Sequence, residues 1–262
     1  MPEMTSYPPG TPCWVDLGTP DIDRAVDFYG SLLGWNVPSS ENPEQTGGYR
    51  IGEIGGKPVA GLMPLMQEGQ PPAWTTYIAT DDADATAAKA KDAGAQEIAA
   101  PMDVMDLGRM ALFADPTGAF FGVWQPRSFP GAGIVGEPGA VVWNELNTRD
   151  PDREKDFYGQ LFGWETRKFE TEGGPPYLTV HVGGNERGVG GIMDTRAYDQ
   201  EAPPHWMVYF AVEDVDATAA RAKERGGTVA QEPMDIPDVG RIAVFHDPAG
   251  AHFAVLRPNP TQ

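Results

Sequence analysis

Apolar and polar residues alternate along residues 11–18, which is the period of a strand that buries one face. Over residues 22–33 the apolar positions instead recur at helical spacing. Thr19 is a suitable N-cap for this helix with Pro20 at its first position, and Gly34 is a suitable residue to end it. The pattern therefore predicts a strand followed directly by a helix.

The same order continues through the first half of the chain. Two short apolar segments, around residues 49–54 and 58–63, predict strands, and residues 74–80 predict another. An Ala-rich helix is expected over residues 82–93, and further strands should flank the Asp-Pro-Thr-Gly turn at residues 115–118. The first half thus consists of strand, helix and strands, twice over.

The second half of the chain repeats the first. The run Asp-Phe-Tyr-Gly at residues 27–30 returns at residues 156–159, and the turn at 115–118 returns as Asp-Pro-Ala-Gly at 247–250. Small loop insertions account for the slight drift in spacing between these pairs. One domain has therefore been duplicated.

A Pro/Gly-rich run, residues 126–139, joins the two copies and predicts a linker. We expect a first domain over residues 1–128, a linker over 129–139 and a second domain over 140–262. Each domain should hold two βαβββ modules. Four such modules indicate an α+β fold, with curved mixed sheets that form cups and helices on the outer face.

Asp27-Phe28-Tyr29 with Leu33-Gly34-Trp35, followed much later by the turn at 115–118, resembles the vicinal-oxygen-chelate superfamily. This group includes glyoxalase I, the bleomycin resistance proteins and the extradiol dioxygenases. The resemblance covers nearly the whole chain, and it is nearest to two-domain glyoxalase-like proteins that are often labelled hydroxylases or secreted antigens. It implies a cup where two modules pair, with a metal at its base in the enzymes. Modules of one half or of both halves could pair.

The resemblance also implies where metal ligands would lie, on the first and last strands of each module. The first-strand positions fall on Trp14, Thr75, Trp143 and Met207, and the last-strand positions on Gly61, Gly122, Gly191 and Ala254. None of these residues is a His, Gln, Glu, Asp or Cys, whereas divalent metals need several converging N, O or S donors. We therefore expect no metal and no other cofactor.

Aromatic side chains at these positions suit a planar apolar ligand, because an indole offers a broad face. Strand alternation adds neighbours on the same faces. The residues expected to line the cups are Trp14, Trp143, Tyr77, Tyr209, Trp124, His205 and His252. The two first-strand tryptophans could instead be core residues, and the histidines could be structural.

Two carboxylates share these faces. Asp16 lies two residues beyond Trp14, and Glu145 lies two beyond Trp143. Desolvation beside an indole raises a carboxyl pKa and could produce a general base. Alternatively, each carboxylate bonds nearby backbone or an arginine, for which Arg109 and Arg241 are candidates. These two arginines could also pair with the helices or meet an anionic group of a ligand.

Charge limits the partners. The formal net charge of −19 argues against nucleic acid and anionic membranes, because phosphate groups favour Lys and Arg. No uncharged apolar run is long enough to span a bilayer. The single cysteine, Cys13, fits a reducing compartment, so we expect a cytoplasmic protein. The duplication could supply the pairing that single-domain relatives obtain by dimerising, which favours a monomer.

The sequence leads to one main functional hypothesis: metal-independent binding of a small aromatic or apolar metabolite in a cup between modules. Sequestration, self-resistance or an accessory role in natural-product tailoring would all fit. The alternative is a glyoxalase-like lyase, isomerase or hydroxylase that uses Asp16 or Glu145, or a relocated metal site at His205 and His252. A third possibility is a protein-interaction module whose cups are filled by their own side chains.

Overall fold

The computed structural model describes residues 3–39, 42–65, 67, 69–170, 176–197 and 202–259. The first half forms β1 (Pro12–Thr19), α1 (Ile22–Leu33), α2 (Pro43–Thr46), β2 (Arg50–Ile54), β3 (Lys57–Pro64), β4 (Ala73–Ala79), α3 (Ala83–Asp92), β5 (Gln96–Val104), β6 (Gly108–Ala114) and β7 (Phe120–Pro126). The second half forms β8 (Val141–Thr148), α4 (Pro151–Phe162), β9 (Glu165–Phe169), β10 (Tyr177–His181), β11 (Gly190–Asp194), the 3₁₀ turn η1 (Thr195–Ala197), β12 (His205–Ala211), α5 (Val215–Glu224), β13 (Thr228–Ile236), β14 (Gly240–His246) and β15 (His252–Pro258).

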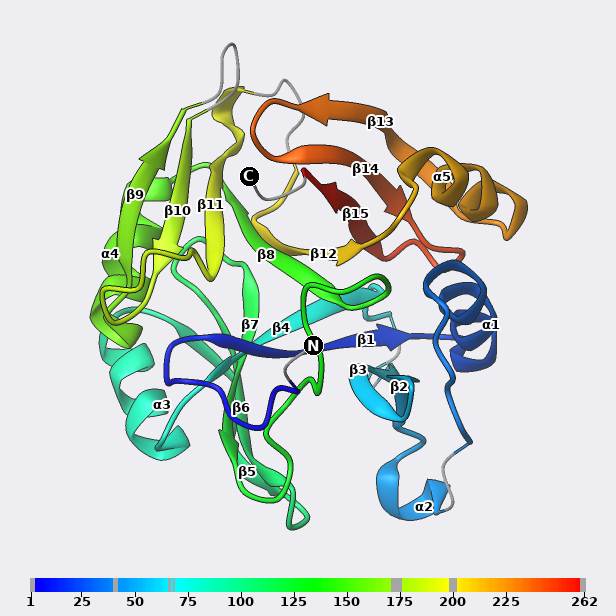
Figure 1. Ribbon diagram of the computed structural model, residues 1–262. Helices are drawn as coiled ribbons and strands as arrows, with labels where there is room; N and C mark the ends of the chain where they lie inside the picture. The colour runs from blue at the N-terminus through cyan, green and yellow to red at the C-terminus, as the bar shows by residue number, and fades with distance from the viewer. Residues whose placement is uncertain are drawn as a thin grey trace.

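Each half builds its own mixed sheet (Figure 1). The described strands of the first half follow the order β2-β3-β1-β4-β7-β6-β5, and those of the second β13-β14-β15-β12-β8-β11-β10-β9. Within a module the first and last strands run parallel, as in β1 with β3, and the two modules join through antiparallel pairs, β1 with β4 and β8 with β12. The tandem α+β architecture is confirmed, and the two modules of one half share each sheet and its cup. The expected βαβββ order fails in the first module, whose described strands are β1, β2 and β3 only.

The outer faces of the sheets pack against the opposite half of the chain. One buried cluster combines the first module of the chain with the last, so that Phe28 and Tyr29 of α1 contact Phe253 of β15. The other combines the two middle modules, where Tyr158 of α4 packs against Phe121 of β7. In Figure 1, α1 lies beside α5, and α4 beside α3. The cups therefore form within halves, whereas the two main cores form between halves.

The helix starts differ from the expectation in one detail. Thr19 and Pro20 precede the first helix, and Asp21 caps it by accepting a hydrogen bond from the Arg24 backbone N–H. The predicted Thr19 cap was therefore wrong. The aspartate carboxylate satisfies an N–H that would otherwise have no partner, and Thr19 remains in β1.

None of the described helices has the length and apolar content needed to cross a bilayer.

The segment that joins the two halves packs against both of them. Ala132 donates its backbone N–H to the Cys13 carbonyl at 2.9 Å, and Gly139 donates to the Ala211 carbonyl at 2.7 Å. The Trp35 indole N–H donates to the Gly139 carbonyl at 2.7 Å. The expected linker is thus fixed in the junction between the halves.

Candidate functional site

A hydrogen-bonded group of four residues lies at the position of the predicted site in the first half. The Trp14 indole N–H donates to the Tyr49 hydroxyl at 2.8 Å, and that hydroxyl donates to Asp16 Oδ2 at 3.3 Å. Tyr77 also hydrogen-bonds the Asp16 carboxyl through its hydroxyl. Strand β1 supplies Trp14 and Asp16, and β4 supplies Tyr77. Tyr49 lies directly before β2, and the buried carboxyl of Asp16 is thus placed between two phenols.

The second half repeats this arrangement. The Trp143 N–H donates to the Tyr177 hydroxyl at 2.7 Å, and Tyr177 hydrogen-bonds Glu145. The Tyr209 hydroxyl donates to Glu145 Oε1 at 3.0 Å, and the Asn147 amide donates to the same oxygen at 3.1 Å. We call each set of Trp, Tyr, carboxyl and Tyr a quartet: Trp14, Tyr49, Asp16 and Tyr77 in the first half, and Trp143, Tyr177, Glu145 and Tyr209 in the second.

Glycine makes room for each quartet. Gly61 lies beside Asp16 in the sheet register, and Gly191 lies beside Glu145. A Cβ added at Gly61 would lie 1.9 Å from the Tyr49 hydroxyl, and one at Gly191 would lie 2.0 Å from the Tyr177 hydroxyl. Each phenol therefore occupies the space that a side chain at the last-strand position would fill.

Burial determines the charge state of the quartets. Desolvation raises the pKa of Asp16 to about 7, although hydrogen bonds from Tyr77 and Tyr49 partly oppose it. The pKa of Glu145 is also raised by desolvation, against the hydrogen bonds from Tyr209, Asn147 and Tyr177. Desolvation and the adjacent carboxylate raise the pKa of Tyr177 well above its usual value, so it remains a donor. The Asp16 carboxyl can thus exchange a proton near neutral pH, and Glu145 holds its proton to a higher pH than an ordinary glutamate.

The positions that bear metal ligands in the metalloenzymes of this fold carry no suitable donors here. The tryptophans of the quartets and the glycines beside the carboxyls have no side-chain lone pair for a metal. Over the described ranges, no group of three or more His, Cys, Asp or Glu residues is arranged to hold a metal ion. The residues at these positions therefore do not fit a divalent metal ion.

Tyr49 and Tyr177 are the site residues that the sequence analysis missed. Tyr49 lies directly before β2 and Tyr177 begins β10, so neither is on the first or last strand of a module, where ligands were sought. A signal was present, because the two tyrosines occupy matching places in the duplicated halves. Aligning the two halves residue by residue would have identified them as a pair.

The first cup is closed by its own side chains. Trp14, Tyr77 and Trp124, which were predicted to line a ligand cup, are buried there, and Tyr7 and Phe129 pack with them. The rings of Trp14 and Phe129 meet edge to face at 4.9 Å. The Trp124 N–H donates to the Phe129 carbonyl at 2.8 Å, which fixes this cover. The N-terminal segment and the segment after β7 thus fill much of the first cup.

In the second cup, the described apolar cluster comes from the strands and their connecting hairpin alone. Met207, Tyr209, Ala254 and Leu256 are buried in it, and Trp143 packs at its edge, partly exposed. This aromatic face is therefore more accessible than its counterpart in the first half.

The predicted histidines lie close together. The rings of His205 and His252 are 5.9 Å apart, with His246, a residue we had not assigned, next to His252. The arginines lie elsewhere: Arg109 pairs with Asp84 and Asp103, and Arg241 pairs in the same way with Asp216 and Asp235. The alternative in which these arginines neutralise Asp16 and Glu145 was therefore wrong.

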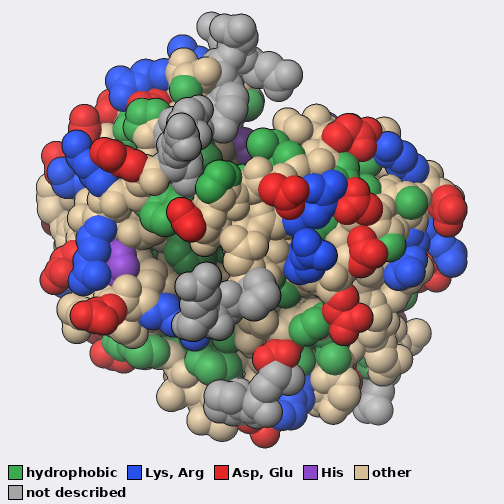
Figure 2. Space-filling model, turned by 45° about the horizontal axis from the view of Figure 1, so that its top comes forward, with side chains coloured by type: hydrophobic (Ala, Val, Ile, Leu, Met, Phe, Trp, Pro, Cys, Tyr) green, Lys and Arg blue, Asp and Glu red, His purple; other side chains and the backbone are tan. Residues whose placement is uncertain are grey.

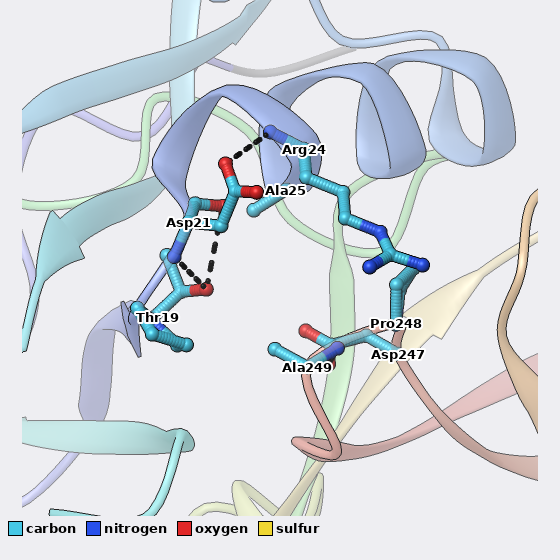
Figure 3. Close-up of a pocket in the computed structure, with 8 residues that line it drawn as sticks. Thr19, Asp21, Arg24, Ala25, Asp247, Pro248 and Ala249 are labelled. Carbon is cyan, nitrogen blue, oxygen red and sulfur yellow. Dashed lines mark hydrogen bonds between the residues drawn. The ribbon is translucent and has the colours of Figure 1, made fainter.

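A cavity of about 140 Å³ lies outside the cups, between the start of α1 and the turn at residues 247–249 (Figure 3). Ala25 and Ala249 line it. At the matching place in the other junction, Glu154 fills the space and accepts a hydrogen bond from the Thr117 backbone N–H at 3.1 Å. The cavity is thus present because Ala25 has a small side chain where the other half has a glutamate.

Comparison with known proteins agrees with this geometry. The family model described as "Glyoxalase/Bleomycin resistance protein/Dioxygenase superfamily" matches residues 13–123 and 140–255. "Putative glyoxylase CFP32" of Mycobacterium bovis is 44% identical over 265 residues, covering 100% of both chains. "Anthracycline biosynthesis protein DnrV" of Streptomyces peucetius is 40% identical, covering 97% of this chain and 95% of that protein.

Solved structures show the same fold at low identity. A Mn(II)-bound glyoxalase from Novosphingobium aromaticivorans superposes with a TM-score of 0.63 at 17% identity, covering 97% of this chain and 86% of the other. A 2,2',3-trihydroxybiphenyl 1,2-dioxygenase from Sphingomonas wittichii gives 0.66 at 16% identity, covering 95% and 91%. The chain therefore belongs to the glyoxalase/bleomycin resistance/dioxygenase superfamily, as a tandem two-domain member.

Proposed function

We propose that this protein binds a planar aromatic small molecule in its second cup, without a metal at the positions used by the metalloenzymes of the fold. Sequestration, self-resistance or an accessory step in natural-product tailoring would each use such binding. The protein would act as a cytoplasmic monomer.

The quartet is the observation that carries this proposal. In both halves a phenol occupies the space beside the carboxyl, and an indole replaces the first-strand ligand. Stacking of a flat ligand ring on the indole face stabilises the complex, while the phenols and the carboxyl offer hydrogen bonds to a polar edge of the ligand. These properties suit an aromatic ligand that carries oxygen substituents.

The second cup is the better candidate because its tryptophan is accessible. Trp143 is partly exposed, whereas Phe129 packs against Trp14 and Tyr7 packs nearby. A ligand could reach the second quartet without displacing these covering residues.

Charge supports a small molecule rather than a nucleic acid. Acidic side chains are spread over the face shown in Figure 2, with basic ones scattered among them. The net charge of −19 would repel a phosphate backbone. Two relatives are named anthracycline biosynthesis proteins, DnrV and DauV, and anthracyclines contain fused aromatic rings.

The proposal can be tested by titrating the protein with 1,8-dihydroxyanthraquinone and following tryptophan fluorescence. Trp143→Ala should raise the Kd about tenfold, the equivalent of about 1.4 kcal/mol, because one stacking partner is lost. Trp14→Ala is the matched control and should change the Kd less than about twofold. Thermal unfolding should verify that both variants fold. Absence of binding, or an equal effect of both variants, would reject the proposal.

A second candidate function is acid–base catalysis at the same quartet. It is favoured by the buried carboxyls: a pKa of about 7 at Asp16 suits proton transfer at neutral pH, and burial shifts the pKa of Glu145 in the same direction. Lyase or isomerase chemistry on an enolisable ligand would use such a group.

Glu145→Gln separates the two functions. For an enzyme, this variant should retain ligand binding and lose turnover by at least about a hundredfold, the usual contribution of a general base. Product formation would be followed by mass spectrometry of the bound ligand after incubation. If neither wild type nor the variant converts the ligand, catalysis at this site is rejected and binding is its sole function.

A further inference from the structure

Three histidines lie at one end of the second cup, on three adjacent strands. His205 lies two residues before Met207 on β12, His252 two before Ala254 on β15, and His246 at the end of β14. Met207 and Ala254 belong to the apolar cluster of the cup, as does Val244 two residues before His246. Since side chains alternate along a strand, all three imidazoles are on the cup face.

The rings contact one another, and one of them has an unsatisfied nitrogen. Nε2 of His252 contacts Nε2 of His246, and the centroids of these two rings are 3.9 Å apart. His205 Nδ1 lies 2.9 Å from the Pro203 carbonyl, while its Nε2 is buried with no hydrogen-bond partner. A buried polar nitrogen without a partner is destabilising, so a ligand that supplied a hydrogen bond to it would be favoured.

The first cup lacks this feature entirely. The residues in the matching places are Ala73, Ala114 and Phe120, and Phe120 is 57% exposed. Duplication kept the quartets in both halves, while this end of the cup became polar only in the second. The second cup can therefore offer hydrogen bonds to a ligand at this end, whereas the first cup cannot.

Within the described part of the chain, no carboxylate hydrogen-bonds these three histidines. Their partners are the Pro203 carbonyl, the Thr228 hydroxyl and one another. Burial lowers the pKa of His205, and burial together with the other two histidines lowers the pKa of His252 to about 4. A neutral imidazole both donates and accepts, which suits a hydroxyl better than an anion.

We propose that His205, His246 and His252 form a recognition site for a phenolic hydroxyl at one end of the aromatic ligand of the second cup. The inference rests on the proposed function and specifies its ligand class. His205 and Tyr209 are about 13 Å apart along β12, from a rise of about 3.3 Å per residue. A polycyclic phenol could span from the quartet to this cluster across Met207, and His252 is exposed at the strand end, where a ligand can reach it.

The test compares 2-naphthol with 2-methylnaphthalene, which have similar shape but differ in the hydroxyl. Wild type should bind 2-naphthol about three- to tenfold more tightly, the effect of one neutral hydrogen bond. The triple variant His205→Ala, His246→Ala and His252→Phe introduces the residues of the first half. It should bind 2-methylnaphthalene as wild type does and lose the preference. Circular dichroism and thermal unfolding check its fold.

Glu145→Gln serves as the matched control, because it changes the hydrogen-bonding group at the other end of the cup. A preference that persists in the triple variant and disappears in Glu145→Gln would overturn the inference and assign hydroxyl recognition to the quartet. Stoichiometric Zn²⁺ or Ni²⁺ binding that only the triple variant abolishes would overturn it in favour of a metal site. Failure of wild type to bind either naphthalene, or the anthraquinone, would reject the proposed function together with the inference.

Discussion

At the scale of single residues, the missing side chains of two glycines determine the chemistry of the cups. Gly61 and Gly191 leave space for the hydroxyls of Tyr49 and Tyr177. Those hydroxyls link an indole N–H to a buried carboxyl, and the carboxyl has no cation beside it in the quartet. Desolvation then raises its pKa, which is the opposite of what a bound metal would do.

Gly191→Ala should therefore damage the second quartet. The new Cβ would overlap the Tyr177 hydroxyl, so we expect a loss of about 1–3 kcal/mol in unfolding free energy and weaker anthraquinone binding. Urea denaturation measures the first effect. Gly159→Ala, within α4, has its nearest contact at 3.5 Å and should instead stabilise by up to about 1 kcal/mol. A neutral Gly191→Ala would contradict this account of the tyrosine.

At the scale of elements, α4 carries a buried glutamate into the junction with the turn at 115–118. Glu154 is fully buried, and its Oε2 has no hydrogen-bond partner. Asp115 lies nearby, held by the Thr117, Gly118 and Ala119 backbone N–H groups at 2.9–3.0 Å. Desolvation, with a further contribution from the Asp115 charge, raises the pKa of Glu154 to about 8.

This pKa predicts a pH dependence of stability. Between the ordinary value of 4.5 and about 8, the folded protein holds a proton on Glu154 that the unfolded chain has lost. The unfolding free energy should therefore fall as pH rises through that window, by at most about 1.4 kcal/mol per unit. Glu154→Gln should remove this slope. The stability of the variant relative to wild type should therefore be higher at pH 9 than at pH 5.

Denaturant melts at several pH values provide the measurement. Asp156→Asn, at an exposed position of the same helix, is the control and should leave the slope as in wild type. An identical pH profile for wild type and Glu154→Gln would show that Glu154 is ionised in the folded protein at neutral pH.

At the scale of the whole molecule, the two halves cannot be separated without exposing both cores. The first and last modules share one core, and the middle modules share the other. The Tyr29 hydroxyl donates to Asp247 at 3.1 Å, and the Tyr158 hydroxyl donates to Asp115 at 3.0 Å. These tyrosines belong to the repeated Asp-Phe-Tyr runs, so each run holds a helix against the opposite half.

Calorimetry should accordingly show one unfolding transition for the whole chain. Phe253→Ala should lower its midpoint without splitting it, at a cost of about 3–5 kcal/mol, because the ring contacts Phe28, Tyr29 and Phe245. Two resolved transitions, with only the later half of the chain affected, would contradict the shared cores.

The sequence alone determined the duplication, the order of elements and the family. Repeated local motifs carry this information, because strand alternation, helical spacing and turn chemistry are written in neighbouring residues. Trp14, Asp16 and Tyr77, with their counterparts in the second half, could be placed on the cup faces by the same alternation.

Tertiary structure decided how these parts meet. No local pattern revealed that Tyr49 and Tyr177 fill the space beside Gly61 and Gly191, since each pair comes from separate segments of the chain. Nor could it show that Phe129 closes the first cup, or that His246 joins His205 and His252. Sequence periodicity specifies which face of an element is buried, but the partner of that face depends on register and packing between distant segments.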